Sequence, residues 1–257
     1  MFKQSYYSDI GVKRKSNQDS LALVKAETNF GEVLLAAVCD GMGGYSMGEL
    51  ASKHCIQTLV SWFKKRFPII LYENGDRMEE KIHGELFSLI RQMNMDLVLY
   101  GRRRQQNLGS TLTALIFVKE KYYCVHVGDS RAYEIGKKIR QITDDQSMVA
   151  EEVRKGILTA EEAKKDKRKN LLTQSVGITM NVEPLFYSGN IVAGNIYLLC
   201  SDGFWHLINE DDIRRYLNPE DIVDNRMFRT HLNYLTQQVM DRGEKDNISS
   251  VGALFTE

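Results

Sequence analysis

The chain has 257 residues, of which 43% are hydrophobic, so it is long enough to bury a sizeable core. Lysine plus arginine and aspartate plus glutamate both number 34, so the formal net charge is zero. That balance disfavours nucleic acid or an anionic membrane as a bulk partner. The first residues lack the apolar core of a signal peptide, and no apolar run reaches the ~18–20 residues of a membrane-spanning helix. A cytoplasmic protein is therefore expected.

The N-terminal third predicts a buried strand followed by two helices. The apolar run 32–39 has the character of a fully buried strand, and it ends at Asp40. After a glycine turn, Ser46 and Glu49 have the spacing of a capping box, which predicts the start of a helix. An apolar stripe with helical spacing over 78–97 predicts a second, longer helix.

The middle of the chain predicts hairpins and then a charged surface segment. The apolar runs 111–118 and 122–127 form the first predicted hairpin, and 131–135 with 138–142 the second. Residues 144–170 are rich in both acidic and basic side chains, which predicts short surface helices. A capping box, made by the threonine and glutamate at 159 and 162, supports this prediction.

The C-terminal third returns to strands and helices. A buried strand is predicted at 195–200, a helix start at Asn218–Pro219 and a last strand at 248–255. Strands and helices are thus segregated, which indicates an α+β fold with two antiparallel sheets packed face to face and covered by helices. Only three prolines and no linker are present, so a single domain over 1–257 is expected. The four cysteines show no Cys-x-x-Cys spacing, and we expect buried free thiols.

Aspartates at strand ends are the strongest functional signal of the chain. Five stand at the ends of strand-like runs or in tight glycine turns: Asp19, Asp40, Asp129, Asp202 and Asp246. Carboxylates gathered in one place repel one another unless cations lie between them, and hard divalent cations take oxygen ligands. If the fold brings these side chains together, the site needs metal.

Charge arithmetic favours two cations. Four of these carboxylates carry four negative charges, which two divalent ions at ~3.5–4 Å separation would cancel. Such a pair produces hydroxide near neutral pH and offsets charge on a phosphoryl oxygen. An incoming phosphate monoester also needs a cationic group, and Arg14 is the candidate because a guanidinium binds phosphate in bidentate fashion.

Eight motifs in order along the chain resemble the metal-dependent serine/threonine protein phosphatases of type 2C. They begin at Gly11, Asp40, Gly109, Gly128, Thr143, Leu172, Ser201 and Asp246, and they read GVKRKSNQD, DGMGG, GST, GDSR, TDDQS, LTQSVG, SDG and DNIS. The resemblance covers residues 5–255. Each motif alone is weak, but eight in order are specific.

The resemblance implies an αββα sandwich with Mn²⁺ or Mg²⁺, two per chain, at one end of the sheets. By position, Asp40 would bridge the two ions, the carbonyl of Gly41 would bind one, and Asp202 and Asp246 would complete the core. It further implies that Asp19 acts through a water on the metal, that Arg14 holds the substrate phosphate, and that Asp129 helps to bind a weaker third ion. Residues 144–170 would be the variable flap.

The implied activity is hydrolysis of phosphoserine and phosphothreonine in proteins without a covalent enzyme intermediate. The resemblance also implies phosphorylated protein substrates and a cognate serine/threonine kinase, and we expect a monomer. Two positions depart from many eukaryotic members: Met42 stands where a histidine is the proposed general acid, and Gln18 where a glutamate is a ligand. Both departures resemble bacterial members.

Two other functions stay open from the sequence. One is a catalytically weak relative that senses phosphorylated proteins, although such relatives usually lose a metal aspartate. The other is a different binuclear phosphohydrolase that acts on diesters. The glycines at 41–44 fit neither dinucleotide nor Walker spacing. Arg102–Arg104 lacks aromatic interleaving, so a helix end is the better interpretation than a nucleic-acid surface.

Overall fold

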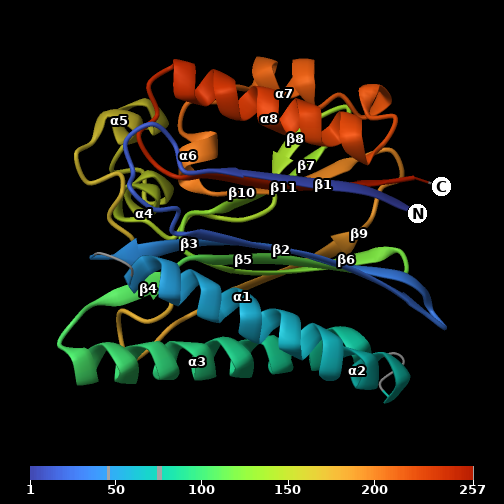
Figure 1. Ribbon diagram of the computed structural model, residues 1–257, viewed down its shortest axis with the longest axis horizontal. Helices are drawn as coiled ribbons and strands as arrows, with labels where there is room; N and C mark the ends of the chain where they lie inside the picture. The colour runs from blue at the N-terminus through green and yellow to red at the C-terminus, as the bar shows by residue number, and fades with distance from the viewer. Residues whose placement is uncertain (45–46, 74–76, 257) are drawn as a thin grey trace.

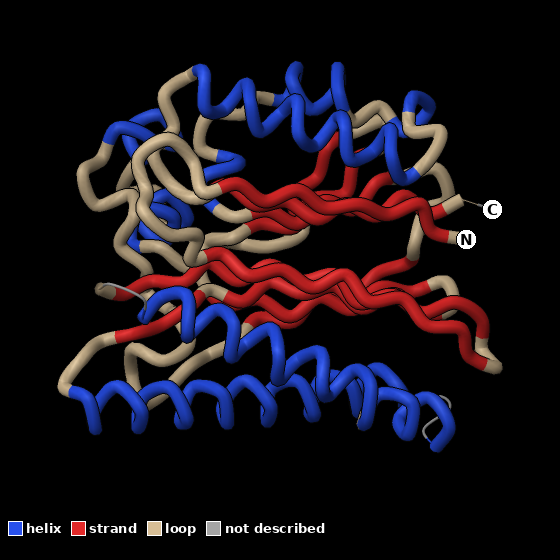
Figure 2. Tube along the Cα trace, in the orientation of Figure 1, coloured by secondary structure: helices blue, strands red, loops and turns tan. Residues whose placement is uncertain are grey.

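Two antiparallel sheets, packed face to face and covered on their outer faces by helices, form the centre of the computed structural model (Figure 1). The structure describes residues 1–44, 47–73 and 77–256. Seen by element type, the strands make two inner layers and the helices two outer ones (Figure 2). The predicted αββα sandwich is therefore confirmed.

The first sheet has five strands in the order β1-β11-β10-β7-β8, all antiparallel. Their bounds are β1 Phe2–Asp9, β7 Arg131–Ile135, β8 Ile139–Gln141, β10 Ile196–Cys200 and β11 Ile248–Phe255. The last strand of the chain thus lies in the middle of this sheet, between the first strand and β10.

The second sheet has the order β2-β3-β5-β6-β9, and the short strand β4 pairs with the end of β3. The bounds are β2 Asp19–Thr28, β3 Gly31–Gly43, β4 Leu108–Ser110, β5 Leu112–Val118, β6 Lys121–Val127 and β9 Leu185–Asn190. The glycines after Asp40 therefore extend a strand.

Helices cover both outer faces. On the second sheet lie α1 Met47–Lys65, α2 Phe67–Glu73 and α3 Met78–Arg104; on the first lie α7 Glu210–Tyr216 and α8 Asn225–Asp241 (Figure 1). The short helices α4 Met148–Arg154, α5 Ala160–Lys165 and α6 Asp202–Trp205 lie at one end of the sandwich. A 3₁₀ turn occupies Pro219–Asp221. Among the described helices, none is long and apolar enough to cross a membrane.

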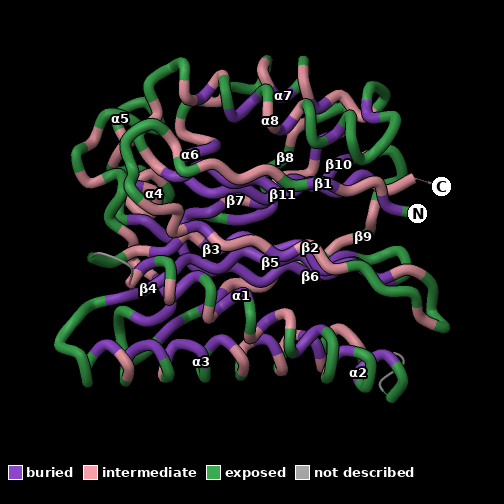
Figure 3. The backbone as a smooth tube through the Cα atoms, in the orientation of Figure 1, coloured by how far each residue is buried: buried purple, intermediate pink, exposed green. Residues whose placement is uncertain are grey.

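Strand alternation divides the core into layers. In β3, Leu35, Ala37 and Cys39 belong to the cluster beneath the helices, whereas Leu34 and Val38 belong to the cluster between the sheets. Both faces of the central strands are buried (Figure 3). Because Asp40 follows this alternation, its side chain enters the layer between the two sheets.

Most elements expected from the sequence are present. Both hairpins are confirmed, the capping box of Thr159 and Glu162 is formed, and all four cysteines are free and buried. The predicted capping residue Ser46 lies outside the described residues. Strands β1, β2, β4 and β9 were not predicted, because their residues are more polar than those of the central strands.

Gly252 in β11 gives a test of how tightly α8 packs on the first sheet. A Cβ at this position would lie 2.2 Å from Cζ of the buried Phe228 in α8. We expect Gly252→Ala to lower the free energy of unfolding by about 1–3 kcal/mol, since a packed core resists added volume. Urea denaturation measures this.

Gly84→Ala is the matched control, because a Cβ at this position in α3 meets nothing within 4 Å. It should raise the free energy of unfolding by about 0.5–1 kcal/mol through better helix propensity. Equal stability of the two variants would contradict this picture of the α8 interface.

Candidate metal centre

Strand ends bring the predicted aspartates to one end of the sandwich. Asp19, the first residue of β2, lies directly opposite Asp40 in the register of β2 and β3. Asp202 begins α6, one residue after β10 ends, and Asp246 lies two residues before β11. Since β10 and β11 are paired, both of these carboxylates come from the same end of the first sheet.

The backbone of Asp40 is held by the motif that follows β4. Its N–H donates to Oγ1 of Thr111 at 2.9 Å, and its carbonyl accepts from the Thr111 N–H at 2.9 Å. The Ser110 hydroxyl also donates to this carbonyl, at 3.0 Å. The next residue is Gly41, where a Cβ would lie 2.0 Å from the carbonyl oxygen of Gly48. Only glycine fits at this position of β3.

Buried serines bind one side of Asp19. The Ser201 hydroxyl donates to Oδ2 of Asp19 at 2.8 Å and accepts from the backbone N–H of Ser249 at 3.0 Å. The other oxygen, Oδ1 of Asp19, is buried and has no hydrogen-bond partner in the described residues, and Oδ1 of Asp202 is in the same state. Buried carboxylate oxygens without donors are costly, so each requires a positive partner.

The electrostatics of the site show that the carboxylates crowd one another. The pKa of Asp19 is raised to about 7, chiefly by burial; the negative charges of Asp202 and Asp246 also raise it, and hydrogen bonds from Ser249 and Ser201 oppose the rise. Burial also raises the pKa of Asp40, with the charges of Asp19 and Asp202 next in effect. The pKa values of Asp202 and Asp129 are raised chiefly by burial as well. Each group thus disfavours the ionised state of its neighbours.

Arg14 is the cation that the structure places at this site. Its Nε donates to Oδ1 of Asp246 at 2.8 Å and its Nη2 to Oδ2 at 2.5 Å, a bidentate ion pair. The side chain of Arg14 is 51% exposed, so the guanidinium lies at the mouth of the site. Asn247 holds the loop that carries Arg14, since its Nδ2 donates to the carbonyls of Ile10 and Ser16.

The remaining predicted aspartate, Asp129, lies in the turn between β6 and β7. It is 6% exposed, and the charge of Asp202 acts on it directly. The structure therefore brings Asp19, Asp40, Asp202 and Asp246 together, with Asp129 beside Asp202.

The donor set fits hard divalent cations. It consists of carboxylates, it includes two buried oxygens without partners, and the groups repel one another. Among the described residues, no three His, Cys, Asp or Glu side chains already form a metal cage. The ion pair between Arg14 and Asp246 contributes to this, because it occupies both oxygens of Asp246.

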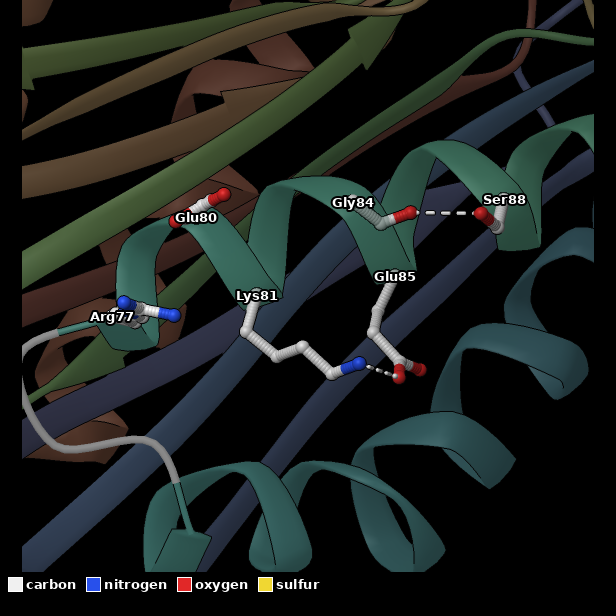
Figure 4. Close-up of a pocket in the computed structure, with 6 residues that line it drawn as sticks. All are labelled: Arg77, Glu80, Lys81, Gly84, Glu85 and Ser88. Atoms are coloured by element: carbon white, nitrogen blue, oxygen red, sulfur yellow. Dashed lines mark hydrogen bonds and ion pairs between the residues drawn. The ribbon is translucent and has the colours of Figure 1, made fainter.

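A hollow of about 460 Å³ lies elsewhere, on α3 (Figure 4). Lys81 and Glu85 in its wall form an ion pair of 3.3 Å, and Ser88 donates to the carbonyl of Gly84. This part of α3 lies at the end of the molecule opposite β4 (Figure 1). The hollow therefore takes no part in the carboxylate site.

Several residues of the site were not predicted as functional. Ser201 and Thr111 lie beside the aspartates. In the sequence they stood out only as members of motifs, and no role was predicted for them. His206 lies with Nε2 3.9 Å from Asp202 and Nδ1 3.6 Å from Glu244. The sequence carried one signal that His206 lies near the site: it follows Asp202 by four residues, so on a helix both side chains lie on the same face.

Comparison with known proteins identifies the family. Residues 12–249 match the family model described as protein phosphatase 2C. Protein phosphatase PhpP of Streptococcus pneumoniae is 32% identical over 213 residues, which are 82% of this chain and 82% of that protein. Serine/threonine phosphatase stp of Listeria monocytogenes is 28% identical over 249 residues, which cover 95% of this chain and 92% of the relative.

Solved structures agree. The serine/threonine phosphatase of S. agalactiae superposes with a TM-score of 0.86 at 29% identity, covering all of both chains. The catalytic domain of PstP, solved in complex with two manganese ions, gives a TM-score of 0.79 at 28% identity and covers 100% of this chain and 99% of that one. The chain belongs to the protein phosphatase 2C family and is a bacterial-type serine/threonine protein phosphatase that depends on divalent metal.

Proposed function

We propose that the carboxylate cluster is the catalytic centre and that it binds two Mn²⁺ or Mg²⁺ ions. The observation that carries this proposal is the convergence of Asp19, Asp40 and Asp202, with partnerless buried oxygens on Asp19 and Asp202. Asp40, the carbonyl of Gly41, Asp202 and Asp246 would hold the ions. When bound, the ions lower the pKa of a bound water and offset negative charge on the phosphoryl group.

The roles of the chain's own residues follow from their positions. Asp19 is fixed through Oδ2 by Ser201, so its Oδ1 is free to accept a hydrogen bond from a water at the centre. Arg14, exposed at the mouth, would bind the phosphate of the substrate, for which it must exchange its contact with Asp246. Met42 has no proton to give, so either water supplies the proton for the leaving alcohol or catalysis is slower than in members with a histidine at this position.

Phosphorylated proteins are the substrates of this family, and we infer a cognate serine/threonine kinase, a monomer and a cytoplasmic location for this chain. We further infer that residues 1–257 act as one catalytic domain, with 144–170 as the flap beside the site. Asp129 would bind a weaker third ion. All five aspartates are retained, which argues against a phosphoprotein sensor without catalysis.

Removal of Asp202 tests the catalytic centre. We expect Asp202→Ala to lower kcat/KM on a phosphothreonine peptide with Mn²⁺ by at least about 100-fold, since loss of a catalytic-site group commonly costs this much. A chelator should have the same effect on the unmodified protein. Asp241→Asn, at the exposed C-terminal end of α8, is the control. Full activity of Asp202→Ala, or activity in the chelator, would refute the assignment.

The pH dependence of stability tests the charge crowding. The pKa of Asp19 in the folded, metal-free protein is raised to about 7 from 3.8. A raised acid pKa means that the folded state holds a proton that the unfolded state releases, so this stabilisation is lost as pH rises through 7. The free energy of unfolding should fall by up to about 1.4 kcal/mol per pH unit between pH 4 and 7 for each such proton.

Urea unfolding of the chelated protein at several pH values measures this. Added Mn²⁺ should abolish the decline, because cations replace the protons. Asp40→Asn should flatten it, because Asp40, whose pKa is also raised by burial, is one of the groups that hold a proton in the folded state. A metal-free protein that gains stability as pH rises from 5 to 7 would contradict the crowding.

Arg14 can be tested separately from the metal. We expect Arg14→Ala to raise KM for the phosphopeptide by roughly 10-fold, with a smaller effect on kcat, because one charge-assisted contact to phosphate is worth ~1.5–3 kcal/mol. Arg14→Lys should recover part of the loss. Unchanged KM in both variants would exclude Arg14 from phosphate binding.

A further inference from the structure

The turn Gly128–Ser130 is held unusually firmly, with side chains bound to each of its three carbonyl oxygens. Nε2 of His126 lies 2.9 Å from the carbonyl of Gly128, Nε1 of Trp205 donates to that of Asp129 at 3.0 Å, and the Thr113 hydroxyl donates to that of Ser130 at 3.0 Å. These three side chains come from β6, α6 and β5. The turn is therefore fixed from three separate elements.

The buried histidine belongs to this clamp as a neutral donor. Burial lowers the pKa of His126 to about 4, so the ring is neutral near pH 7. A carbonyl only accepts, so Nε2 carries the hydrogen and donates to Gly128. Nδ1 then carries no hydrogen and lies 2.9 Å from the Thr113 hydroxyl, whose single hydrogen is shared between Nδ1 and the Ser130 carbonyl. The Ser130 hydroxyl adds a contact of 2.7 Å to Thr111, which in turn holds Asp40.

The carboxylate of Asp129 contrasts with its fixed backbone. It is nearly buried, yet in the described part of the chain no other side chain donates a hydrogen bond to it. A carboxylate on a backbone this rigid, bound by no other side chain in the described residues, is suited to receive a cation.

Trp205 joins this turn to the helix that carries Asp202. It is the last residue of α6, and Asp202 is the first. Because its indole N–H donates to the Asp129 carbonyl, this short helix links the backbone of Asp129 to Asp202. The Arg131 guanidinium stacks 3.3 Å from the centroid of the indole ring and forms a bidentate ion pair with Asp145. The indole ring is thus held in place by Arg131, independently of its hydrogen bond to Asp129.

We propose that Trp205 is a positioning residue that, with His126 and Thr113, fixes the carboxylate of Asp129 relative to Asp202 for a divalent cation. This rests on the proposed function in that Asp129 binds an ion. Trp205 acts through the Asp129 backbone and does not itself touch the ion. The clamp makes the affinity of the Asp129 site dependent on a hydrogen bond that lies outside the ligand set.

Titration of metal-stripped protein with Mn²⁺ alone, followed by calorimetry, tests the proposal. The unmodified protein should show tight sites and one weaker site, and Asp129→Asn should lack the weaker one. Trp205→Phe keeps an aromatic ring but removes the N–H donor, and it should weaken that site by roughly 10-fold while the tight sites stay unchanged. Trp62→Phe, at the only other tryptophan, should leave the isotherm unchanged.

Two further measurements keep the test independent of the folding of Trp205→Phe. Thr113→Val removes a second donor of the clamp and should weaken the same site. In Trp62→Phe, the single remaining tryptophan is Trp205, and its fluorescence should change at the Mn²⁺ concentrations that fill the weaker site. Adding Asp129→Asn should abolish that change.

Unchanged isotherms for Trp205→Phe and Thr113→Val, or equal weakening of all sites, would overturn the proposal. So would an isotherm that Asp129→Asn does not alter. The proposed function is tested separately, by Mn²⁺-dependent hydrolysis of the phosphothreonine peptide by the Trp62→Phe protein. It fails only if that activity is absent or is unaffected by Asp202→Ala.

Discussion

Mutual repulsion among buried carboxylates is the constraint on which this molecule depends. Asp19 and Asp40 stand opposite one another across two strands, and the charge of Asp202 acts on both. Hydrogen bonds within a rigid double sheet hold these side chains where, without cations, their charges oppose one another. The folding free energy of the two packed sheets therefore offsets the repulsion among the carboxylates. Divalent cations remove that repulsion and make the cluster a binding centre.

The apolar strands and the aspartates that end them could be predicted from the sequence. The run before Asp40 and the run before Asp202 are long and β-branched or apolar, so both the strand and its end were visible. The hairpin of β5 and β6 was visible for the same reason. The edge strands β2 and β9 were not, because polar and apolar residues are mixed in both, and only two residues of β2 and none of β9 are buried.

The contacts that make the site work could not be predicted. Ser201 binds Asp19 across 182 residues of chain, and Arg14 pairs with Asp246 across 232. Neither spacing carries a local signal: packing of one sheet on the other creates the first contact, and pairing of β1 with β11 brings the loop of Arg14 to Asp246. The family resemblance gave the identity of the aspartates, whereas the hydrogen bonds around Asp129, including that from Trp205, required the three-dimensional structure.

The central place of β11 has a consequence for how the protein is made. During synthesis β1 leaves the ribosome before every other described strand, whereas β11, with which it pairs, is the last of the described strands to emerge. Until then β1 has an unpaired edge, and Asp246 is missing from the cluster. A chain cut before β11 therefore leaves β1 without its neighbour and lacks Asp246, so we expect it not to assemble the carboxylate cluster.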